Sequence, residues 1–233
     1  MIKNICFTGL LAAGLSSLAF SSSAADLSGK VTLQGKPKPE IPIQLDASCG
    51  KLHSSPITTR HYVVGQDNGL ANVFVYVKEG AAKTPPPSQP VVVDQKGCVY
   101  HPYVFGAVVG QKIIVRNSDP LLHNVHGTPK VNKEFNFAQP VKGQENTISF
   151  DKPEVFVRIK CDVHSWMFTY AGVCEHPYFA VTDKDGNFTI KNLPPGKYTL
   201  EAIHLKAGAK TQPITISEGA ATPVNFELSA PAS

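Results

Sequence analysis

The chain has 233 residues and a formal net charge of +4, a mildly basic balance that points to no particular charged partner. Its lysine and arginine residues do not cluster among aromatic residues, which argues against a nucleic-acid-binding surface. Beyond the N-terminus, no apolar run is long enough to cross a membrane.

The first 25 residues have the pattern of a secretory signal peptide. Lys3 gives a short positive start, an apolar stretch runs from Ile5 to Phe20, and small residues precede Asp26. Glycine and serine interrupt the apolar stretch, so a membrane anchor is the weaker interpretation. We expect cleavage after Ala25 and a periplasmic or secreted protein that is not an integral membrane protein after cleavage.

Short β-rich segments follow one another through the mature chain, and no long helical periodicity appears. Closely spaced short strands between turn residues predict an all-β sandwich or barrel. Residues 84–90 are too rich in proline for a central strand and are expected to form an exposed loop. The predicted strands of this first unit lie in residues 71–80, 90–100, 110–119, 146–150 and 153–161.

A second, smaller β unit is predicted to begin near His176. In residues 178–190, two apolar runs flank Asp185-Gly186, a turn pair that predicts a hairpin. Further strands are predicted in residues 192–205, 212–219 and 222–228.

Four cysteines remain after the predicted cleavage: Cys49, Cys98, Cys161 and Cys174. In an oxidising compartment disulfides are the default, and four cysteines allow three complete pairings. Any other role for Cys161 must therefore compete with a disulfide to Cys174 or Cys98.

The strongest chemical pattern is Cys-x2-His-x2-Met at residues 161–167. Side chains alternate between the faces of a strand, so Cys161 is expected to point into the core with the aliphatic side chains that precede it. Thiolate and thioether favour copper(I), and imidazole suits both copper states. His123 follows a predicted strand and an Asn-Ser-Asp-Pro loop, and it supplies a second imidazole. We therefore predict one copper ion held by His123, Cys161, His164 and Met167, with Met167 as a long axial ligand.

Residues 117–127 and 161–167 together resemble the ligand loops of the cupredoxins, small blue-copper electron carriers of the amicyanin and plastocyanin type. The resemblance covers roughly residues 97–172. It implies a Greek-key β-sandwich, the same four copper ligands, and a role for Asn124 in bracing the two ligand loops. It also implies that electrons enter through His164 on an exposed loop.

Residues 179–202 resemble the carboxypeptidase regulatory-like or transthyretin-like sandwich. This turn-and-strand pattern implies a fold and no peptidase chemistry. We expect residues 26–174 to form a cupredoxin-like copper-binding domain with an N-terminal extension. Residues 175–233 are expected to form a carboxypeptidase regulatory-like β-sandwich.

The remaining cysteines have one simplest assignment once Cys161 binds metal. It is a disulfide between Cys49 and Cys98, which leaves Cys174 as a buried thiol that behaves as a small hydrophobe. The pairing of these three cysteines stays open from sequence alone.

Several other side chains near the motif could act on the metal. Trp166 is expected to pack over the site and limit the access of solvent. His126 would point away from His123 if both lie on one strand, His101 is expected at the surface, and His176 in the linker. Whether any of these three histidines adds to the metal site stays open.

Three functions remain compatible with the sequence. The first is a periplasmic blue-copper protein that carries single electrons between redox partners, such as a cytochrome or a periplasmic dehydrogenase. The second is an exchangeable copper-binding protein for delivery, storage or resistance, and the third is a metal-free adhesion or carbohydrate-binding sandwich. No Ser-His-Asp set, paired carboxylates or second metal site stands out, so we expect a carrier and not an enzyme.

Overall fold

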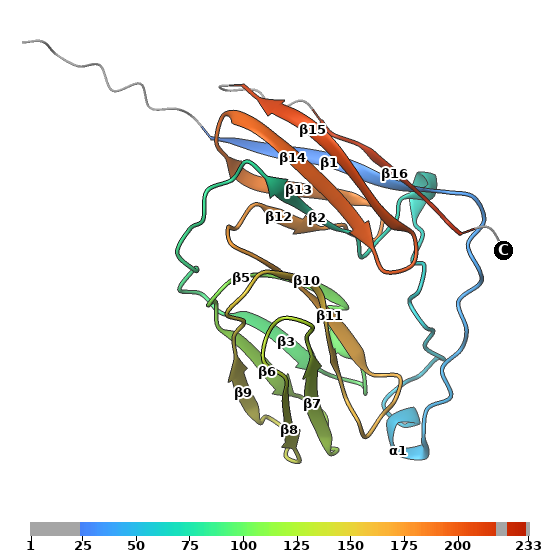
Figure 1. Cartoon of the computed structure of the whole chain (residues 1–233). Coiled ribbons are helices and arrows are strands. Elements are labelled where there is room, and N and C mark those ends of the chain that lie inside the picture. Colours follow the sequence, from blue (N-terminus) through green and yellow to red (C-terminus); the bar gives the residue numbers. More distant parts are fainter. Residues whose placement is uncertain (1–23, 218–222, 232–233) are drawn as a thin grey trace, which may run out of the picture.

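The structure is a computed structural model that describes residues 24–217 and 223–231. The predicted signal peptide, residues 1–25, lies outside the described residues except for its last two. The described part of the chain forms two packed β-sandwiches, drawn one above the other in Figure 1, which confirms the predicted all-β class. Among the described residues, no helix is both long enough and apolar enough to span a membrane.

The first sandwich contains the middle of the chain. A five-stranded sheet of order β5-β11-β10-β7-β8 faces a four-stranded sheet of order β4-β3-β6-β9. Its core includes Val93, Ile113, Val115 and Ile159, which are all fully buried. The strands are β3 (Val91–Gln95), β4 (Tyr100–His101), β5 (Val104–Val108), β6 (Ile113–Asn117), β7 (His123–Thr128), β8 (Phe135–Gln139), β9 (Glu145–Ile148), β10 (Glu154–Lys160) and β11 (Phe168–Cys174).

Strand β10 places Cys161 in the core, as the alternation of side chains along the strand predicts. Val157, Ile159 and Cys161 are all buried in the core of the first sandwich. The alternation fails earlier, because Phe156 has a left-handed backbone (φ 61°) and the register with β11 shifts between Val155 and Val157. This bulge turns Val155 towards the other sandwich.

The second sandwich combines strands from both ends of the chain. Its sheets have the orders β13-β1-β16 and β12-β2-β14-β15. The strands are β1 (Ala25–Gln34), β2 (Phe74–Glu79), β12 (Phe179–Val181), β13 (Asn187–Leu193), β14 (Gly196–His204), β15 (Gly208–Ile216) and β16 (Phe226–Ser229).

Two features of the second sandwich differ from the sequence prediction. Strand β2 and all of β1 except Ala25 come from residues 26–174, which the sequence assigned to the copper-binding domain, yet both strands pair with C-terminal strands. Strands β12 and β13 flank the Asp185-Gly186 turn, but they do not form a hairpin, because β12 pairs with β2 and β13 with β1. A turn signal acts locally, whereas the choice of partner strand depends on which distant segment completes each sheet.

The two sandwiches meet through an apolar cluster. Phe74, Tyr103, Val104 and Cys174 are buried there. The ring of Phe74 lies against Gly172, where an added Cβ would come 2.4 Å from the ring. Glycine at 172 therefore lets a strand of one sandwich pack directly on a strand of the other.

Between β1 and β2, the chain leaves the second sandwich and extends along the first sandwich to its far end. Residues 35–63 run down to helix α1 (Ala47–Gly50), beside the loop that joins β10 to β11, and return (Figure 1). Within this excursion the two arms pair with each other at Pro42 and Thr58. The short 3-10 helix η1 (Gln66–Asn68) follows before β2 begins. We call residues 35–63 the strap.

Candidate metal centre

Two neighbouring antiparallel strands bring the predicted ligands to one end of the first sandwich. Lys160, the last residue of β10, pairs with His126 of β7. Cys161 directly after β10 therefore lies next to the start of β7, which is His123. The backbone N–H of Asn124 donates to Sγ of Cys161 at 3.4 Å.

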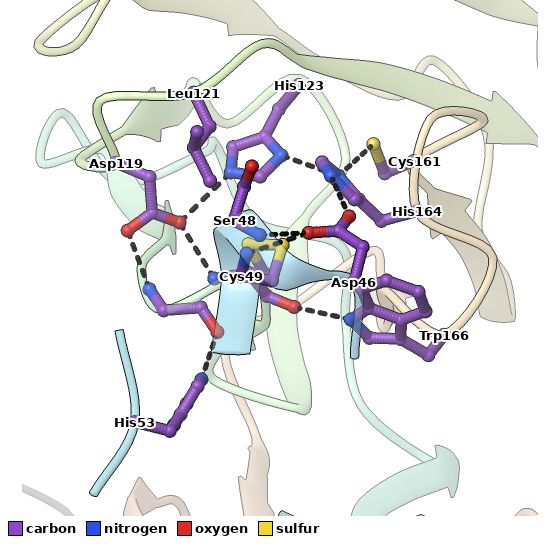
Figure 2. The surroundings of a disulfide bond; sticks show 12 residues. Asp46, Ser48, Cys49, His53, Asp119, Leu121, His123, Cys161, His164 and Trp166 are labelled. Atoms are coloured by element: carbon purple, nitrogen blue, oxygen red, sulfur yellow. Dashed lines mark hydrogen bonds and ion pairs between the residues drawn. A yellow bond between two sulfur atoms is a disulfide. The ribbon is translucent and has the colours of Figure 1, made fainter. Parts of the chain in front are cut away.

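Three of the four predicted ligands converge in the structure (Figure 2). Nδ1 of His164 lies 3.1 Å from Nδ1 of His123 and 3.7 Å from Sγ of Cys161. One ligand atom from each residue lies within 4.8 Å of those of the other two, and all three side chains are buried. Cys161 is a free thiol, so it is not used in a disulfide.

The loop from Cys161 to Met167 is closed by its own backbone. The N–H of Cys161 donates to the carbonyl of Met167 at 3.0 Å, and the N–H of Met167 donates to the carbonyl of His164 at 2.9 Å. Met167 is fully buried in the same apolar cluster as Cys161. A tight loop anchored at a strand end holds side chains with little freedom to rearrange.

Asn124 ties the two ligand segments together, as the resemblance implied. Its side-chain amide donates to Asn136 at 2.8 Å and to Oδ2 of Asp162 at 3.2 Å, and its side-chain oxygen accepts the backbone N–H of Asp162. Asn124 neighbours one predicted ligand and Asp162 neighbours another. The bond network therefore fixes the distance between the segments that carry His123 and Cys161.

An aspartate that sequence reasoning did not single out supports His123. Oδ2 of Asp119 lies 3.0 Å from Nε2 of His123, and this carboxylate also accepts the backbone N–H groups of Gly97 at 2.7 Å and Cys98 at 2.8 Å. The Asn-Ser-Asp-Pro loop before His123 contains this residue, so its position four residues upstream was the available signal. A carboxylate on one imidazole nitrogen leaves the other nitrogen free to bind a metal.

The charges of the cluster favour an ionised sulfur. Burial raises the pKa of the Cys161 thiol, but hydrogen bonds from His123 and from the N–H of Asn124 outweigh burial and hold that pKa below its usual value. Burial lowers the pKa of His123, yet Asp119 and Cys161 raise it more strongly, to about 9. Burial and the nearby charge of His123 lower the pKa of His164. The thiolate is the form that binds metals, so this environment suits a metal ligand.

His164 is covered by the strap, and this corrects the expectation that it lies exposed. Only 5% of His164 is accessible. Oδ2 of Asp46 lies 3.5 Å from its Nε2, and α1 stands beside it (Figure 2). Nothing in the local sequence around Asp46 signalled this contact, because the two residues come from distant segments.

A disulfide joins Cys49 of α1 to Cys98 of the first sandwich, which confirms the simplest predicted pairing. It lies beside the two imidazoles in Figure 2. Trp166 packs next to His164, with 5.3 Å between their ring centroids, and its Nε1–H donates to the carbonyl of Cys98 at 3.0 Å. The strap, the disulfide and the indole ring together cover the centre.

The other candidate residues lie outside the converging set. His126 faces the opposite side of β7, where its ring nitrogens lie 2.7 Å from Asp162 and 2.8 Å from Glu134. His101 is exposed. His176 stacks on Tyr178 and lines a cleft of about 320 Å³ with Cys174, whose free thiol is buried.

The donor set agrees with the chemistry of copper. Two imidazoles and a thiolate with a buried thioether nearby form a mixed soft and borderline set. A carboxylate oxygen lies 3.0 Å from Nε2 of His123 and 3.5 Å from Nε2 of His164, and the two Nδ1 atoms lie 3.1 Å apart within the cluster. This arrangement can hold one soft transition-metal ion away from bulk water.

Comparison with solved structures finds copper proteins at low overall similarity. A copper-containing nitrite reductase from Thermus scotoductus SA-01 is 25% identical over 42% of this chain, with a TM-score of 0.32, and the alignment spans 25% of the reductase's length. A purple cupredoxin from Nitrosopumilus maritimus is 19% identical over 36% of this chain and 98% of its own, with a TM-score of 0.31. A mutant amicyanin in the Cu(I) form is 20% identical over 42% of this chain and 97% of its own, with a TM-score of 0.33.

No curated protein sequence matches the chain. Residues 175–229 match the family model of the carboxypeptidase regulatory-like domain. Both resemblances expected from the sequence, to the cupredoxins and to the carboxypeptidase regulatory-like domain, are therefore found among the comparisons.

Proposed function

We propose that this chain is a blue-copper protein that carries single electrons between redox partners, with copper held by His123, Cys161, His164 and Met167. The observation that carries the proposal is the convergence of Nδ1 of both histidines and Sγ of Cys161 in a buried cluster. Bound copper would supply a one-electron couple between Cu(I) and Cu(II).

The protein's own contribution is to hold the donors in place and exclude water. The ligand loop is closed by backbone bonds, and Asn124 fixes it against the segment that carries His123. A site that changes little between oxidation states needs little rearrangement when an electron moves. This rigidity supports an electron carrier. The burial of His123, Cys161 and His164 supports the same choice over an enzyme, because it keeps substrates away from the metal position.

The partner we propose is another redox protein, a cytochrome or a dehydrogenase of the periplasm. Two exposed apolar side chains, Leu122 and Val163, directly precede His123 and His164 and are 48% and 50% accessible. Apolar side chains beside a redox centre suit brief contact with a partner surface. A periplasmic location agrees with the predicted signal peptide and with the disulfide.

The test is the visible and electron paramagnetic resonance spectra of the mature protein loaded with Cu(II). We expect an intense thiolate-to-copper band and a reversible one-electron couple. Cys161→Ser should abolish the band, because a hydroxyl is a poor ligand for copper. Cys174→Ser is the matched control, since it removes the second buried free thiol of the described residues and should leave the band unchanged.

Other outcomes would favour the other functions. An intense band in Cys161→Ser would contradict the ligand assignment. Copper that passes quickly to a chelator and shows no reversible couple would support delivery or storage. A folded protein with a free Cys161 that takes up no copper would leave the metal-free adhesion or carbohydrate-binding function.

A further inference from the structure

The disulfide and the two histidines are linked by two aspartates in matching ways. Asp119 accepts the backbone N–H of Cys98 at 2.8 Å and lies 3.0 Å from Nε2 of His123. Asp46 accepts the backbone N–H of Cys49 at 2.8 Å and lies 3.5 Å from Nε2 of His164. Each half of the disulfide is thus connected through one carboxylate to one of the two predicted imidazole ligands (Figure 2).

The two links differ in how firmly they are held. Asp119 is buried within the first sandwich and accepts two backbone N–H groups there. The side chain of Asp46 is 47% accessible, and apart from His164 its partners are the N–H groups of Ser48 and Cys49 in α1 itself. The covalent tie between α1 and the first sandwich is the Cys49–Cys98 bond. Besides this bond, the strap is held there by the ring of His53, whose Nε2 lies 2.6 Å from the carbonyl of Gly97, and by Leu45, which packs on the core. The disulfide is the strongest of these contacts, because it alone is covalent.

The disulfide also lies close enough to the centre to influence it directly. One ligand atom each from Cys49, Cys98 and His164 lie within 4.8 Å of one another, and so do atoms of Cys98, Asp119 and His123. Both half-cystines are fully buried. The disulfide therefore lies within 4.8 Å of nitrogen atoms of both imidazoles in the cluster.

We propose that Asp46 is a positioning residue for His164, and that the Cys49–Cys98 disulfide is the latch that keeps it in place. The redox state of the disulfide then sets the properties of the metal centre. Reduction breaks one S–S bond and uses two electrons and two protons from a dithiol protein, whose own sulfurs become a disulfide. The two thiols that form no longer tie α1 to the sandwich, Asp46 moves away, and His164 becomes accessible.

The direction of the effect on copper follows from charge. A carboxylate beside a ligand imidazole stabilises Cu(II) more than Cu(I), because Cu(II) carries the larger positive charge. Loss of such a supporting partner lowers metal affinity by roughly 10-fold or more. If only Cu(II) affinity falls 10-fold, the reduction potential rises by about 59 mV for one electron. This copper readout rests on the proposed function.

Two variants isolate the carboxylate from its structural role. Asn and Ser both cap a helix as Asp46 does, so Asp46→Asn and Asp46→Ser should keep α1 intact. The Asp46→Asn change removes the negative charge. The Asp46→Ser change removes the charge and also shortens the side chain, so that it no longer extends to His164. Both should weaken Cu(II) binding by roughly 10-fold and raise the potential. Asp67→Asn is the matched control, because Asp67 is an exposed aspartate of η1 away from the centre.

The latch is tested by combining these changes with Cys49→Ser/Cys98→Ser. If the disulfide acts through Asp46, the double cysteine variant should show the same change as Asp46→Asn. Adding Asp46→Asn to that variant should then produce little further change. If the triple variant instead lost roughly 100-fold in Cu(II) affinity, the two changes would act independently and the proposal would be overturned. An unchanged reduction potential in Cys49→Ser/Cys98→Ser would also overturn it.

A measurement on the metal-free wild-type chain keeps the test independent of copper and of the variants' folding. Nitrogen-15 NMR would follow Nε2 of His164, and amide exchange would follow residues 46–50, before and after reduction with a phosphine. The phosphine and one water molecule reduce the disulfide to two thiols: the water supplies both protons and the oxygen of the phosphine oxide. We expect a changed Nε2 shift and faster exchange in α1 after reduction. Unchanged signals after complete reduction would refute the latch, even if the copper proposal holds.

Discussion

Replacing Asn124 with alanine should weaken metal binding more than it weakens the fold. The Asn124 side chain makes three hydrogen bonds, two to Asp162 and one to Asn136, and the residue is 9% accessible. At about 1 kcal/mol net for each bond, the loss of stability is about 3 kcal/mol. The lost clamp also frees the segment at Cys161 relative to that at His123. Loss of such support should lower copper affinity by roughly 10- to 100-fold.

The matched control is Asn132→Ala in the same sandwich. The side chain of Asn132 likewise forms several hydrogen bonds: it accepts the backbone N–H groups of Asp151 and Lys152 and donates to Lys152 and Glu154. Urea unfolding of the metal-free proteins would compare stabilities, and competition with a copper chelator would compare affinities under folding conditions. We expect similar losses of stability in both variants and weaker copper binding only in Asn124→Ala. Equal copper affinities in the two variants would refute the clamp.

Three further predictions concern single buried side chains. Burial lowers the pKa of His204 to about 4, so the unfolded chain takes up a proton near pH 6.5 before the folded chain does. Stability in the metal-free protein should therefore fall by about 3 kcal/mol as the pH drops from 6.5 towards 4, and urea unfolding of His204→Gln should show a smaller fall. Met167→Leu conserves volume and should retain copper with a shifted potential in voltammetry, whereas loss of all copper would contradict an axial role. Burial raises the pKa of the Cys174 thiol to about 12, so iodoacetamide at pH 8 should label Cys174 only after denaturation, as peptide mass spectrometry can show.

The sequence predicted the burial of Cys161 correctly, because that signal is local. The alternation along β10 correctly placed Cys161 in the core, because a regular pleat directs every second side chain to one face. The same rule failed at Val155, where the left-handed Phe156 inserts a bulge. A bulge of this kind leaves no clear mark in a run of Val, Phe and Ile.

Features that depend on distant segments were missed for a common physical reason. The contact between Asp46 and His164 joins the strap to the loop after β10, and each partner looks ordinary in its own neighbourhood. The assignment of β1 and β2 to the second sandwich likewise depends on hydrogen bonds to C-terminal strands. Composition and periodicity describe a segment's preference for a strand, but the partner that satisfies its backbone is set by the whole fold.

The strap connects the second sandwich to the candidate metal centre. The strap leaves from the end of β1 and the chain returns to β2, and both strands are fixed in the second sandwich by pairing. At its tip, α1 is fixed to the first sandwich by the Cys49–Cys98 bond. Residues 35–63 are therefore held at both ends by one sandwich and at the middle by the other. The strap therefore joins the second sandwich to the segment that places Asp46 beside His164.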